Sequence, residues 1–473
     1  MKIKFGTSGW RAIIADDFTF GNVKLVVQAI ADYIYSIHAQ NKGIIVTSDT
    51  RFLGEQFREF AARILAANGI KVFLTKRDTP TPVCAYEILR RKTAGGINFT
   101  ASHNPPFYQG IKYSPPNGAP APLEVTKWIE DRIKDISNEK MQLELKNIQE
   151  FEKMKLVEII DPQKEYFKQL KKYIDFDVIK KSKLNIVYDC MHGTGRDYLD
   201  TILKQNGCKV EILNNSLDPY FGGFSPEPAK NNIPDLIKKI KTSKNSFGVA
   251  TDGDADRFGF VDFGGYCIDA NFIIALLLDY IIKHKKWVGS AVRSLATTHL
   301  IDSIARKNNI KLHDVPVGFK FIGEIMQRED ILIGGEESGG LTVHRHVPEK
   351  DGILACLLVI EMVARTKKSL NELLRELYKN YGTFYTDRLN LHLNDATKNK
   401  LFTFLKENTP SKINNLPVAQ VDTRDGIKTI LKDGSWVLVR FSGTEPIVRF
   451  YLEAKTKKQL DELKKYATKL LNF

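Results

Sequence analysis

The stretch Thr100-Ala101-Ser102-His103-Asn104-Pro105 follows the apolar run Gly96-Ile97-Asn98-Phe99, and the rest of the chain is organised around it. A serine at the end of a strand, followed by polar residues and proline, lies in a loop where a substrate can reach it. Its oxygen can carry covalent chemistry when a neighbouring group activates it. His103 need not be the base, because adjacent side chains on an extended segment point in opposite directions. Taken alone, the stretch is better explained as a surface turn held by serine and asparagine, and it is the other loops of the chain that reverse this interpretation.

Strands and helices alternate on both sides of this loop. Before it, the apolar pattern predicts helices at 22–38 and 55–68 and strands at 43–47 and 71–74. Residues 124–182 are rich in lysine, glutamate and asparagine and are mostly helical in pattern, with a domain junction expected near 145–160. After them come predicted strands at 184–188, 209–213, 246–250, 288–293 and 331–333, alternating with helices at 233–243, 271–284, 297–308 and 352–366. This order predicts parallel α/β layers up to about Phe384, where the alternation changes.

Length and composition limit the number of domains, the membrane association and the state of the cysteines that can be expected. A chain of 473 residues is too long for one core, and three or four domains are expected. Asp279 and Glu361 interrupt or end the two longest apolar runs, so we expect buried helices and no membrane association. Met1–Gly6 has no apolar signal-peptide core, and the five cysteines are scattered without CxxC spacing. Both features predict reduced thiols in a cytoplasmic protein.

The chain is basic, with a net charge of +14. Such a charge could serve nucleic acid or an anionic small substrate. The lysines lie mostly in amphipathic stretches, such as Lys238-Lys239 and Lys367-Lys368, where a solvated helix face explains them. We therefore expect no nucleic-acid partner.

Three aspartates, Asp252, Asp254 and Asp256, stand at alternate positions after the predicted strand 246–250. Carboxylates this close repel one another unless a hard cation lies among them, and oxygen ligands suit Mg²⁺. An EF-hand is excluded because no glutamate stands at the twelfth position. A merely acidic solvated loop fits poorly, because apolar strands flank the segment on both sides. The loop therefore predicts a site for one Mg²⁺.

Three further loops offer groups that recognise phosphate or sugar. The glycine-rich turn Phe5–Arg11 can present N–H groups and a guanidinium to an oxyanion, although a plain hairpin fits as well. Glu336 and Ser338 offer an acceptor and a donor to vicinal hydroxyls, although a simple turn fits too. The last loop offers a guanidinium, two hydroxyls and close backbone approach, which a phosphate dianion requires, although Ser-Gly-Thr also makes ordinary turns. Its residues are Arg440, Ser442, Gly443 and Thr444, with Arg449 one strand-length further on. Together the loops predict phosphoryl transfer to or from a phosphorylated polyol.

In this order the motifs resemble those of the α-D-phosphohexomutase superfamily, across nearly the whole chain. The stretches that carry the resemblance are Gly6–Arg11, Thr100–Pro105, Asp252–Arg257, Gly335–Gly340 and Arg440–Pro446. The resemblance implies four domains around a central cleft: three α/β units with mixed sheets and a smaller α+β C-terminal domain. The expected boundaries are 1–155 with the phosphoserine loop, 156–266 with the metal loop, 267–382 with the sugar-binding loop and 383–473 with the phosphate-binding loop.

The resemblance also implies a role for each residue. Ser102 would be carried as phosphoserine and would join the three aspartates as a ligand of Mg²⁺. Arg11 and Lys112 would lie over Ser102 as catalytic groups, with His103 beside it. Whether Lys112, Lys320 or His103 carries the proton stays open. The substrate would be bound by Arg257, Lys320, Glu336, Ser338, Arg440, Ser442, Gly443, Thr444 and Arg449.

The implied reaction interconverts hexose 1-phosphate and hexose 6-phosphate through a hexose 1,6-bisphosphate, which is both intermediate and activator. The loop Gly335–Gly340 resembles that of glucose-type phosphoglucomutases, since the phosphomannomutase/phosphoglucomutase group usually has Met at the place of Glu337 and His at that of Gly340. A phosphomannomutase or a dual enzyme is the alternative, followed by a non-catalytic phosphosugar-binding protein and a phosphatase. We expect a small phosphosugar as partner and a monomer or weak homodimer.

Overall fold

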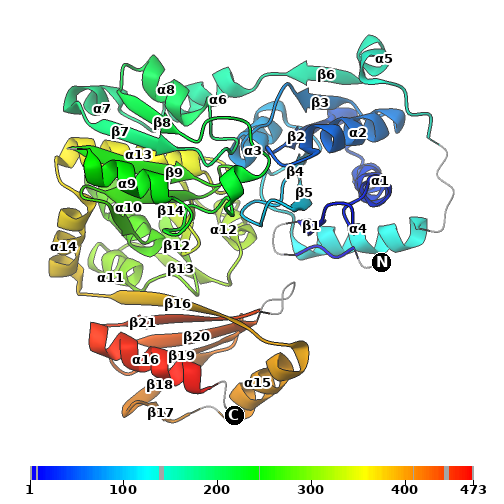
Figure 1. Ribbon diagram of the computed structural model, residues 1–473. Helices are drawn as coiled ribbons and strands as arrows, with labels where there is room; N and C mark the ends of the chain where they lie inside the picture. Colours follow the sequence, from blue (N-terminus) through cyan, green and yellow to red (C-terminus); the bar gives the residue numbers. More distant parts are fainter. Residues whose placement is uncertain are drawn as a thin grey trace.

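The computed structural model describes residues 3–6, 9–137, 143–243, 245–408, 410–441 and 447–470. It contains four sheets that follow one another along the chain. In Figure 1 the first sheet lies at the upper right, the second and third at the upper left, and the fourth beneath them. None of the helices among the described residues combines the length and apolar character needed to cross a membrane.

The first sheet is mixed, in the order β1-β5-β4-β2-β3-β6. Strands β4, β2, β3 and β6 run parallel; at one edge β5 pairs antiparallel with β4, and β1 pairs antiparallel with β5. The strands are β1 (Trp10–Ile13), β2 (Ile44–Ser48), β3 (Val72–Thr75), β4 (Gly96–Phe99), β5 (Tyr108–Ser114) and β6 (Val157–Ile160). The helices are α1 (Phe20–Ser36), η1 (Gln40–Lys42), α2 (Gly54–Ala67), α3 (Thr81–Arg91), α4 (Leu123–Ile136) and α5 (Ile148–Lys153).

Residues 124–182 are mostly helical, as expected, but they also contain strand β6, which the sequence did not indicate. Its four residues Val-Glu-Ile-Ile pair with β3 and complete the first sheet. A run this short, between lysine- and glutamate-rich helices, has too few alternations to indicate a strand, and only pairing with β3 makes it one. The boundary expected at 155/156 falls just before β6 and stays a prediction.

The second and third sheets are also mixed, in the orders β11-β10-β9-β7-β8 and β13-β12-β14-β15. The second has strands β7 (Asn185–Asp189), β8 (Val210–Leu213), β9 (Ser246–Thr251), β10 (Phe258–Asp262) and β11 (Tyr266–Ile268), with α6 (Gln163–Leu170), α7 (Phe176–Ser182), α8 (Leu199–Gln205), η2 (Phe221–Gly223) and α9 (Pro234–Thr242). The third has β12 (Ser290–Ser294), β13 (Leu312–Val315), β14 (Ile331–Glu336) and β15 (Gly340–Val343), with α10 (Ala270–His284), α11 (Leu300–Lys307), α12 (Phe319–Met326), α13 (Gly352–Thr366) and α14 (Leu370–Tyr381).

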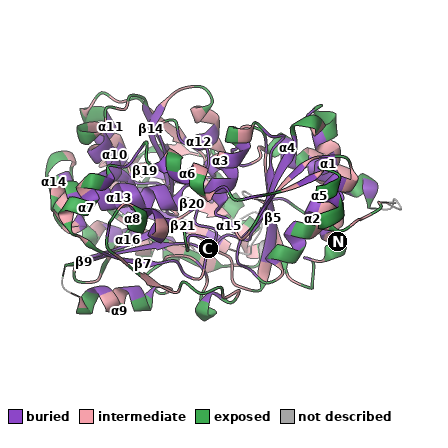
Figure 2. Cartoon of the chain, turned by 90° about the horizontal axis from the view of Figure 1, so that it is seen from above, coloured by how far each residue is buried: buried purple, intermediate pink, exposed green. Residues whose placement is uncertain are grey.

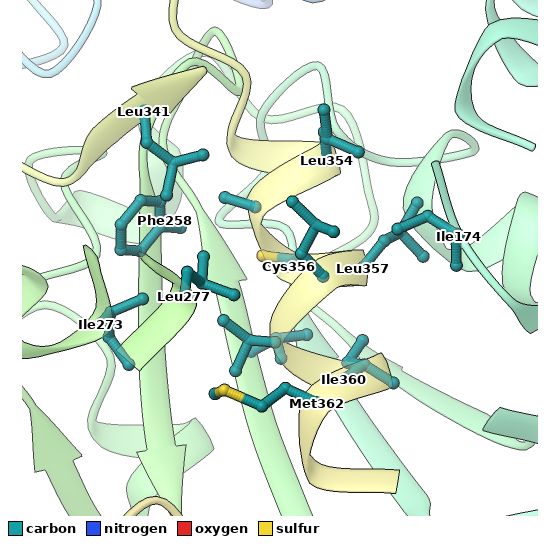
Figure 3. Close-up of a cluster of buried hydrophobic side chains, with 14 of the residues drawn as sticks. Ile174, Phe258, Ile273, Leu277, Leu341, Leu354, Cys356, Leu357, Ile360 and Met362 are labelled. Carbon is teal, nitrogen blue, oxygen red and sulfur yellow. The ribbon is translucent and has the colours of Figure 1, made fainter. Parts of the chain in front are cut away.

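Helix α13 joins these two sheets through one core. Every residue from Gly352 to Ala364 is buried, the charged Glu361 included, so up to its last two residues the helix has no solvent face. Figure 3 shows its side chains meeting Phe258 of the second sheet, Leu277 of α10 and Ile174, which follows α6. The contrast with a surface helix is plain in Figure 2, where α9 has an exposed face over strands that are buried.

The fourth sheet is antiparallel throughout, in the order β16-β21-β20-β19-β18-β17. It comprises β16 (Tyr385–His392), β17 (Lys412–Ile413), β18 (Leu416–Asp422), β19 (Ile427–Leu431), β20 (Trp436–Phe441) and β21 (Ile447–Ala454), with α15 (Asp395–Glu407) and α16 (Lys457–Lys469). It rests on the third unit through Trp436, Leu438 and Tyr451, which pack on Leu295 and Ala296. The expected architecture of three α/β units with mixed sheets and an α+β C-terminal domain is confirmed.

Candidate functional site

The loop that carries Ser102 begins where β4 ends. Ser102 has the left-handed φ of 54°, which serine adopts only when its surroundings impose it. Its backbone N–H donates to the Thr100 hydroxyl at 2.8 Å, and the residue is 1% exposed. The Ser102 Oγ lies 3.3 Å from Oδ2 of Asp252, which belongs to the loop after β9. The predicted nucleophile and the predicted metal loop therefore meet.

The three aspartates lie together. One oxygen from each of Asp252, Asp254 and Asp256 falls within 4.8 Å of the others, and all three residues are fully buried. Oδ1 of Asp254 and Oδ1 of Asp256 have no hydrogen-bond partner among the described residues. Buried carboxylate oxygens without partners are costly, and a hard divalent cation would satisfy them. The donor set therefore fits Mg²⁺.

The charges in the loop act on one another. Burial raises the pKa of Asp252 well above its ordinary value, and repulsion from Asp256 and Asp254 raises it further. Burial also acts to raise the pKa of Asp256, yet that pKa lies below its ordinary value because the ammonium groups of Lys112 and Lys350 outweigh the effect. The three carboxylates thus repel one another, and the two lysines favour the charged form of Asp256.

Close backbone packing fixes the metal loop. Gly253 donates its N–H to the Pro226 carbonyl at 3.0 Å, and the Thr194 N–H donates to the Gly253 carbonyl at 3.0 Å. A Cβ added at Gly193 would lie 2.8 Å from the carbonyl oxygens of both Asp252 and Gly253. Only glycine therefore allows the His192–Gly195 turn to approach the metal loop this closely.

Thr81 ties the metal loop to the first unit. Its hydroxyl donates to Asp254 Oδ2 at 2.6 Å, and its N–H, in the first turn of α3, donates to the Asp254 carbonyl at 2.9 Å. A hydroxyl and an N–H from one residue hold both the side chain and the backbone of Asp254. Sequence reasoning did not find this contact, because nothing in the run Thr79-Pro80-Thr81 indicates which loop it meets.

Two lysines face the aspartates. Lys112 Nζ lies 2.6 Å from Asp254 Oδ2 and 3.1 Å from Asp256 Oδ2. Lys350 Nζ lies 2.9 Å from Asp256 Oδ2 and 3.1 Å from Glu349 Oε1. Burial acts to lower the pKa of each lysine, but the carboxylates outweigh it and raise both values. Both groups are therefore protonated and within reach of the reaction centre.

Lys350 was not among the predicted residues. The signal for it is the run Glu349-Lys350-Asp351, three charges placed directly before the buried and mostly apolar helix α13. Asp351 is the N-cap of α13 and accepts the N–H of Leu354 at 2.8 Å. Charged residues that are buried at the start of an apolar helix point to a structural or chemical role.

Arg11, His103 and Arg257 lie near the same centre. Arg11 Nη1 donates to Asn104 Oδ1 at 2.6 Å, and burial, with Arg257 nearby, lowers its pKa to about 10. Burial, with Arg257 and Arg11 nearby, lowers the pKa of His103 well below its ordinary value, so the imidazole is neutral. Arg257 donates from Nη1 to Glu227 at 3.2 Å, and its N–H donates to Asp252 Oδ1 at 2.9 Å.

The predicted sugar loop is the turn between β14 and β15. Glu336 Oε1 accepts the N–H of Gly318 at 2.7 Å, and burial, with Glu337 next to it, raises the pKa of Glu336 to about 7. Glu337 accepts the Ser294 hydroxyl at 3.2 Å. Ser338 lies in the turn itself and is partly exposed. Lys320 lies in the first turn of α12 with Nζ 5.0 Å from the Phe321 ring centre, and no hydrogen bond joins it to Ser102 or the aspartates in the described chain.

The fourth unit brings two arginines side by side. Arg440 of β20 and Arg449 of β21 are direct cross-strand partners. Like charges in such positions repel, so an anion bound between them would be favoured. Arg440 Nε donates to Asp425 Oδ2 at 2.9 Å, and the same oxygen accepts the N–H of Val317, beside the sugar loop. The predicted phosphate residues Ser442, Gly443 and Thr444 lie outside the described residues.

Comparisons with known proteins agree with this geometry. The chain matches the phosphoglucomutase/phosphomannomutase family unit by unit: α/β/α domain I at residues 2–140, domain II at 164–265, domain III at 269–381 and the C-terminal domain at 404–470. A Thermococcus kodakarensis protein named phosphoglucomutase/phosphomannomutase is 32% identical over 467 residues, which cover 99% of this chain and 98% of that protein.

Two further similar proteins are assigned to other sugar phosphates. A Methanosphaera stadtmanae protein assigned as a phosphoglucosamine mutase is 30% identical over 99% of this chain and 98% of its own length. The crystal structure of a Thermus thermophilus protein assigned as a phosphomannomutase has a TM-score of 0.87 and 32% identity, with all of both chains covered. The fold, the order of the loops and these relatives lead to one conclusion: the chain belongs to the phosphoglucomutase/phosphomannomutase family of the α-D-phosphohexomutase superfamily, whose members are phosphosugar isomerases.

Proposed function

We propose that the protein interconverts glucose 1-phosphate and glucose 6-phosphate through a phosphoserine at Ser102 and a glucose 1,6-bisphosphate intermediate. The observation that carries the proposal is the 3.3 Å separation between Ser102 Oγ and Asp252 Oδ2, at the edge of a buried carboxylate cluster that suits a divalent cation. A nucleophilic oxygen at such a site, with ammonium groups beside it, fits phosphoryl transfer better than any other reaction class.

Asp252, Asp254 and Asp256 would hold Mg²⁺, which when bound would neutralise charge on the transferring phosphoryl group. The chain supplies the rest. The loop of Ser102 presents its oxygen at the end of β4, and the Thr100 hydroxyl fixes the backbone N–H of that residue. Lys112 and Lys350 each lie within 3.1 Å of an aspartate oxygen and can exchange a proton with a sugar hydroxyl. Both are protonated at rest, so either can donate its proton to the leaving oxygen and then accept the proton of the attacking hydroxyl.

The sugar and its second phosphate would bind between the third and fourth units. Glu336 and Ser338 offer groups to the sugar hydroxyls, and Arg440 with Arg449 offers guanidinium donors to the phosphate that is not being transferred. Because the two phosphates exchange places during the reaction, this site must accept either end of the sugar. A guanidinium pair suits that requirement, since it recognises phosphate and not the carbon that bears it.

Glucose is proposed over mannose because Gly335–Gly340 carries Glu337 where mannose-type enzymes usually have Met. In this structure Glu337 is held by the Ser294 hydroxyl on one side, and its N–H donates to the Thr297 hydroxyl at 3.2 Å on the other. A carboxylate fixed in this way can select the direction of a single sugar hydroxyl. A dual specificity is the second candidate, since the Thermococcus relative is named for both activities.

The test is coupled turnover of glucose 1-phosphate, mannose 1-phosphate and glucosamine 1-phosphate side by side, each with a catalytic amount of its bisphosphate. Wild-type protein incubated with glucose 1,6-bisphosphate should gain one phosphate by intact mass, mapped to Ser102, and Ser102→Ala should lose nearly all turnover. Release of inorganic phosphate at the rate of turnover would identify a phosphatase. Turnover that persists in Ser102→Ala would refute the phosphoserine.

A further inference from the structure

Arg51 lies beneath the Ser102 loop and is fully withdrawn from solvent. Its guanidinium donates to four backbone carbonyls of that loop and the strand after it: Ser102 at 2.7 Å, Asn104 at 2.6 Å, Pro105 at 2.8 Å and Tyr108 at 3.0 Å. The remaining donor, Nε, lies 3.1 Å from Oδ2 of Asp49. The hydrogen bonds of this one side chain thus hold the whole turn from Ser102 to the start of β5.

Asp49 supports the N–H side of Ser102 through Thr100. Its Oδ2 accepts the Thr100 hydroxyl at 2.6 Å, and the Thr100 oxygen in turn accepts the N–H of Ser102 at 2.8 Å. Its Oδ1 accepts the N–H of Arg51 at 3.0 Å. The N–H and the carbonyl of Ser102 are therefore both fixed by hydrogen bonds. Both sets of hydrogen bonds lead to Asp49 and Arg51, which directly follow β2.

The second unit packs against Arg51 and the Ser102 loop. The ring of Phe221, in η2, lies 5.1 Å from the Arg51 guanidinium carbon, on its face. A Cβ added at Gly253 of the metal loop would lie 3.2 Å from the Ser102 carbonyl oxygen, the same oxygen that Arg51 binds. The guanidinium therefore lies where the nucleophile loop meets the metal loop, and its donors go to Asp49 and the loop carbonyls.

We propose that Arg51, with Asp49 and Thr100, is a positioning residue that holds Ser102 in its left-handed conformation and keeps its Oγ directed at the metal site. The inference rests on the proposed role of Ser102 as phosphoryl carrier. Ser102 needs such support, because a φ of 54° costs energy for a serine and relaxes when the loop is released. A nucleophile displaced by about 1 Å loses on the order of a hundredfold in rate.

Arg51→Lys is the informative variant. Lysine keeps the positive charge, but its three donors cannot replace the fork that reaches four carbonyls and a carboxylate. We expect kcat to fall at least tenfold while KM for glucose 1-phosphate stays within twofold, because the guanidinium donors of Arg51 are engaged by Asp49 and the loop carbonyls. Phosphorylation of Ser102 by glucose 1,6-bisphosphate, followed by rapid quench and intact mass, should slow by the same factor as kcat.

Arg63→Lys is the matched control. Arg63, on α2, also donates to two backbone carbonyls, those of Leu145 and Lys146, at 2.8 and 2.7 Å, but not to the Ser102 loop. It should keep the wild-type kcat. Thr100→Val and Thr100→Ser give a second series that does not depend on how Arg51→Lys folds: valine removes the hydroxyl bridge and should lower kcat, and serine should recover most of that loss.

Three results would overturn the inference: wild-type kcat in Arg51→Lys, a loss confined to KM, or an equal loss in Arg63→Lys. Equal rates for Thr100→Val and Thr100→Ser would do so as well. Failure of the proposed function looks different, because wild-type protein itself would then take up no phosphate on Ser102.

Discussion

Glu336 provides a sharp test of the electrostatics, since it is a buried carboxyl whose pKa is raised to about 7. Burial is the main cause, and Glu337 adds to it. Below the ordinary carboxyl pKa both folded and unfolded chains hold the proton, and the group has no effect. As pH rises, the unfolded chain releases the proton first, so the group destabilises the fold increasingly until it also ionises there.

The size of the effect follows from the shift. From the ordinary value of 4.5 to about 7 is roughly 2.5 pKa units, or about 3 kcal/mol at 1.36 kcal/mol per unit. Glu336→Gln removes the charge but keeps an oxygen to accept the Gly318 N–H, which now lies 2.7 Å from Oε1. The variant should therefore match wild type near pH 4.5 and become more stable than wild type by up to about 3 kcal/mol at pH 8.

The assay is the difference in Tm between Glu336→Gln and wild type at several values from pH 5 to pH 8. The difference should grow in favour of the variant up to about pH 7 and then level off. KM for glucose 1-phosphate should rise in the variant, because the carboxylate is a proposed sugar ligand. A difference in Tm that is the same at every pH would refute the reasoning, since it would mean that Glu336 titrates alike in the folded and unfolded chains.

Three further predictions concern the metal, the proton and the distal phosphate. EDTA should abolish turnover and Mg²⁺ restore it, and Mg²⁺ should raise the Tm of wild type but not of Asp254→Asn; turnover in chelator would show that the cluster needs no cation. Lys112→Met and Lys350→Met should each lower kcat more than tenfold, and if both stay within threefold of wild type, about 0.7 kcal/mol in the barrier, neither carries the proton. Arg440→Lys should raise KM for glucose 1-phosphate with little change in kcat, because it loses bidentate donors worth about 1.5–3 kcal/mol each; an unchanged KM would assign Arg440 a structural role.

The sequence predicted the fold class and the loops that meet, because each loop follows an apolar strand and carries residues whose chemistry is recognisable at short range. Ser102 and the three aspartates are of this kind. β6 escaped prediction because its four residues become a strand only through pairing with β3.

Other residues of the site could not be predicted, because their roles depend on long-range packing. Lys350 is one charge in a short charged run until the fold directs it at Asp256, 2.9 Å away. In the sequence Arg51 is an ordinary loop arginine, and only the fold brings the carbonyls of residues 102–108 within hydrogen-bond distance of it. Asp425 joins the third and fourth units by accepting the N–H of Val317, more than a hundred positions away.

The burial of α13 between the second and third sheets has a consequence for how the protein unfolds. Side chains from both sheets share one core with this helix, whereas the first and fourth sheets have cores of their own. Four architectural units should therefore melt as three cooperative ones. A recombinant fragment that stops after the second sheet, at residue 268, would leave the surface that receives α13 exposed and should aggregate. One that runs from 161, just after β6, to 384 keeps the core that both sheets share with α13 and should fold by itself.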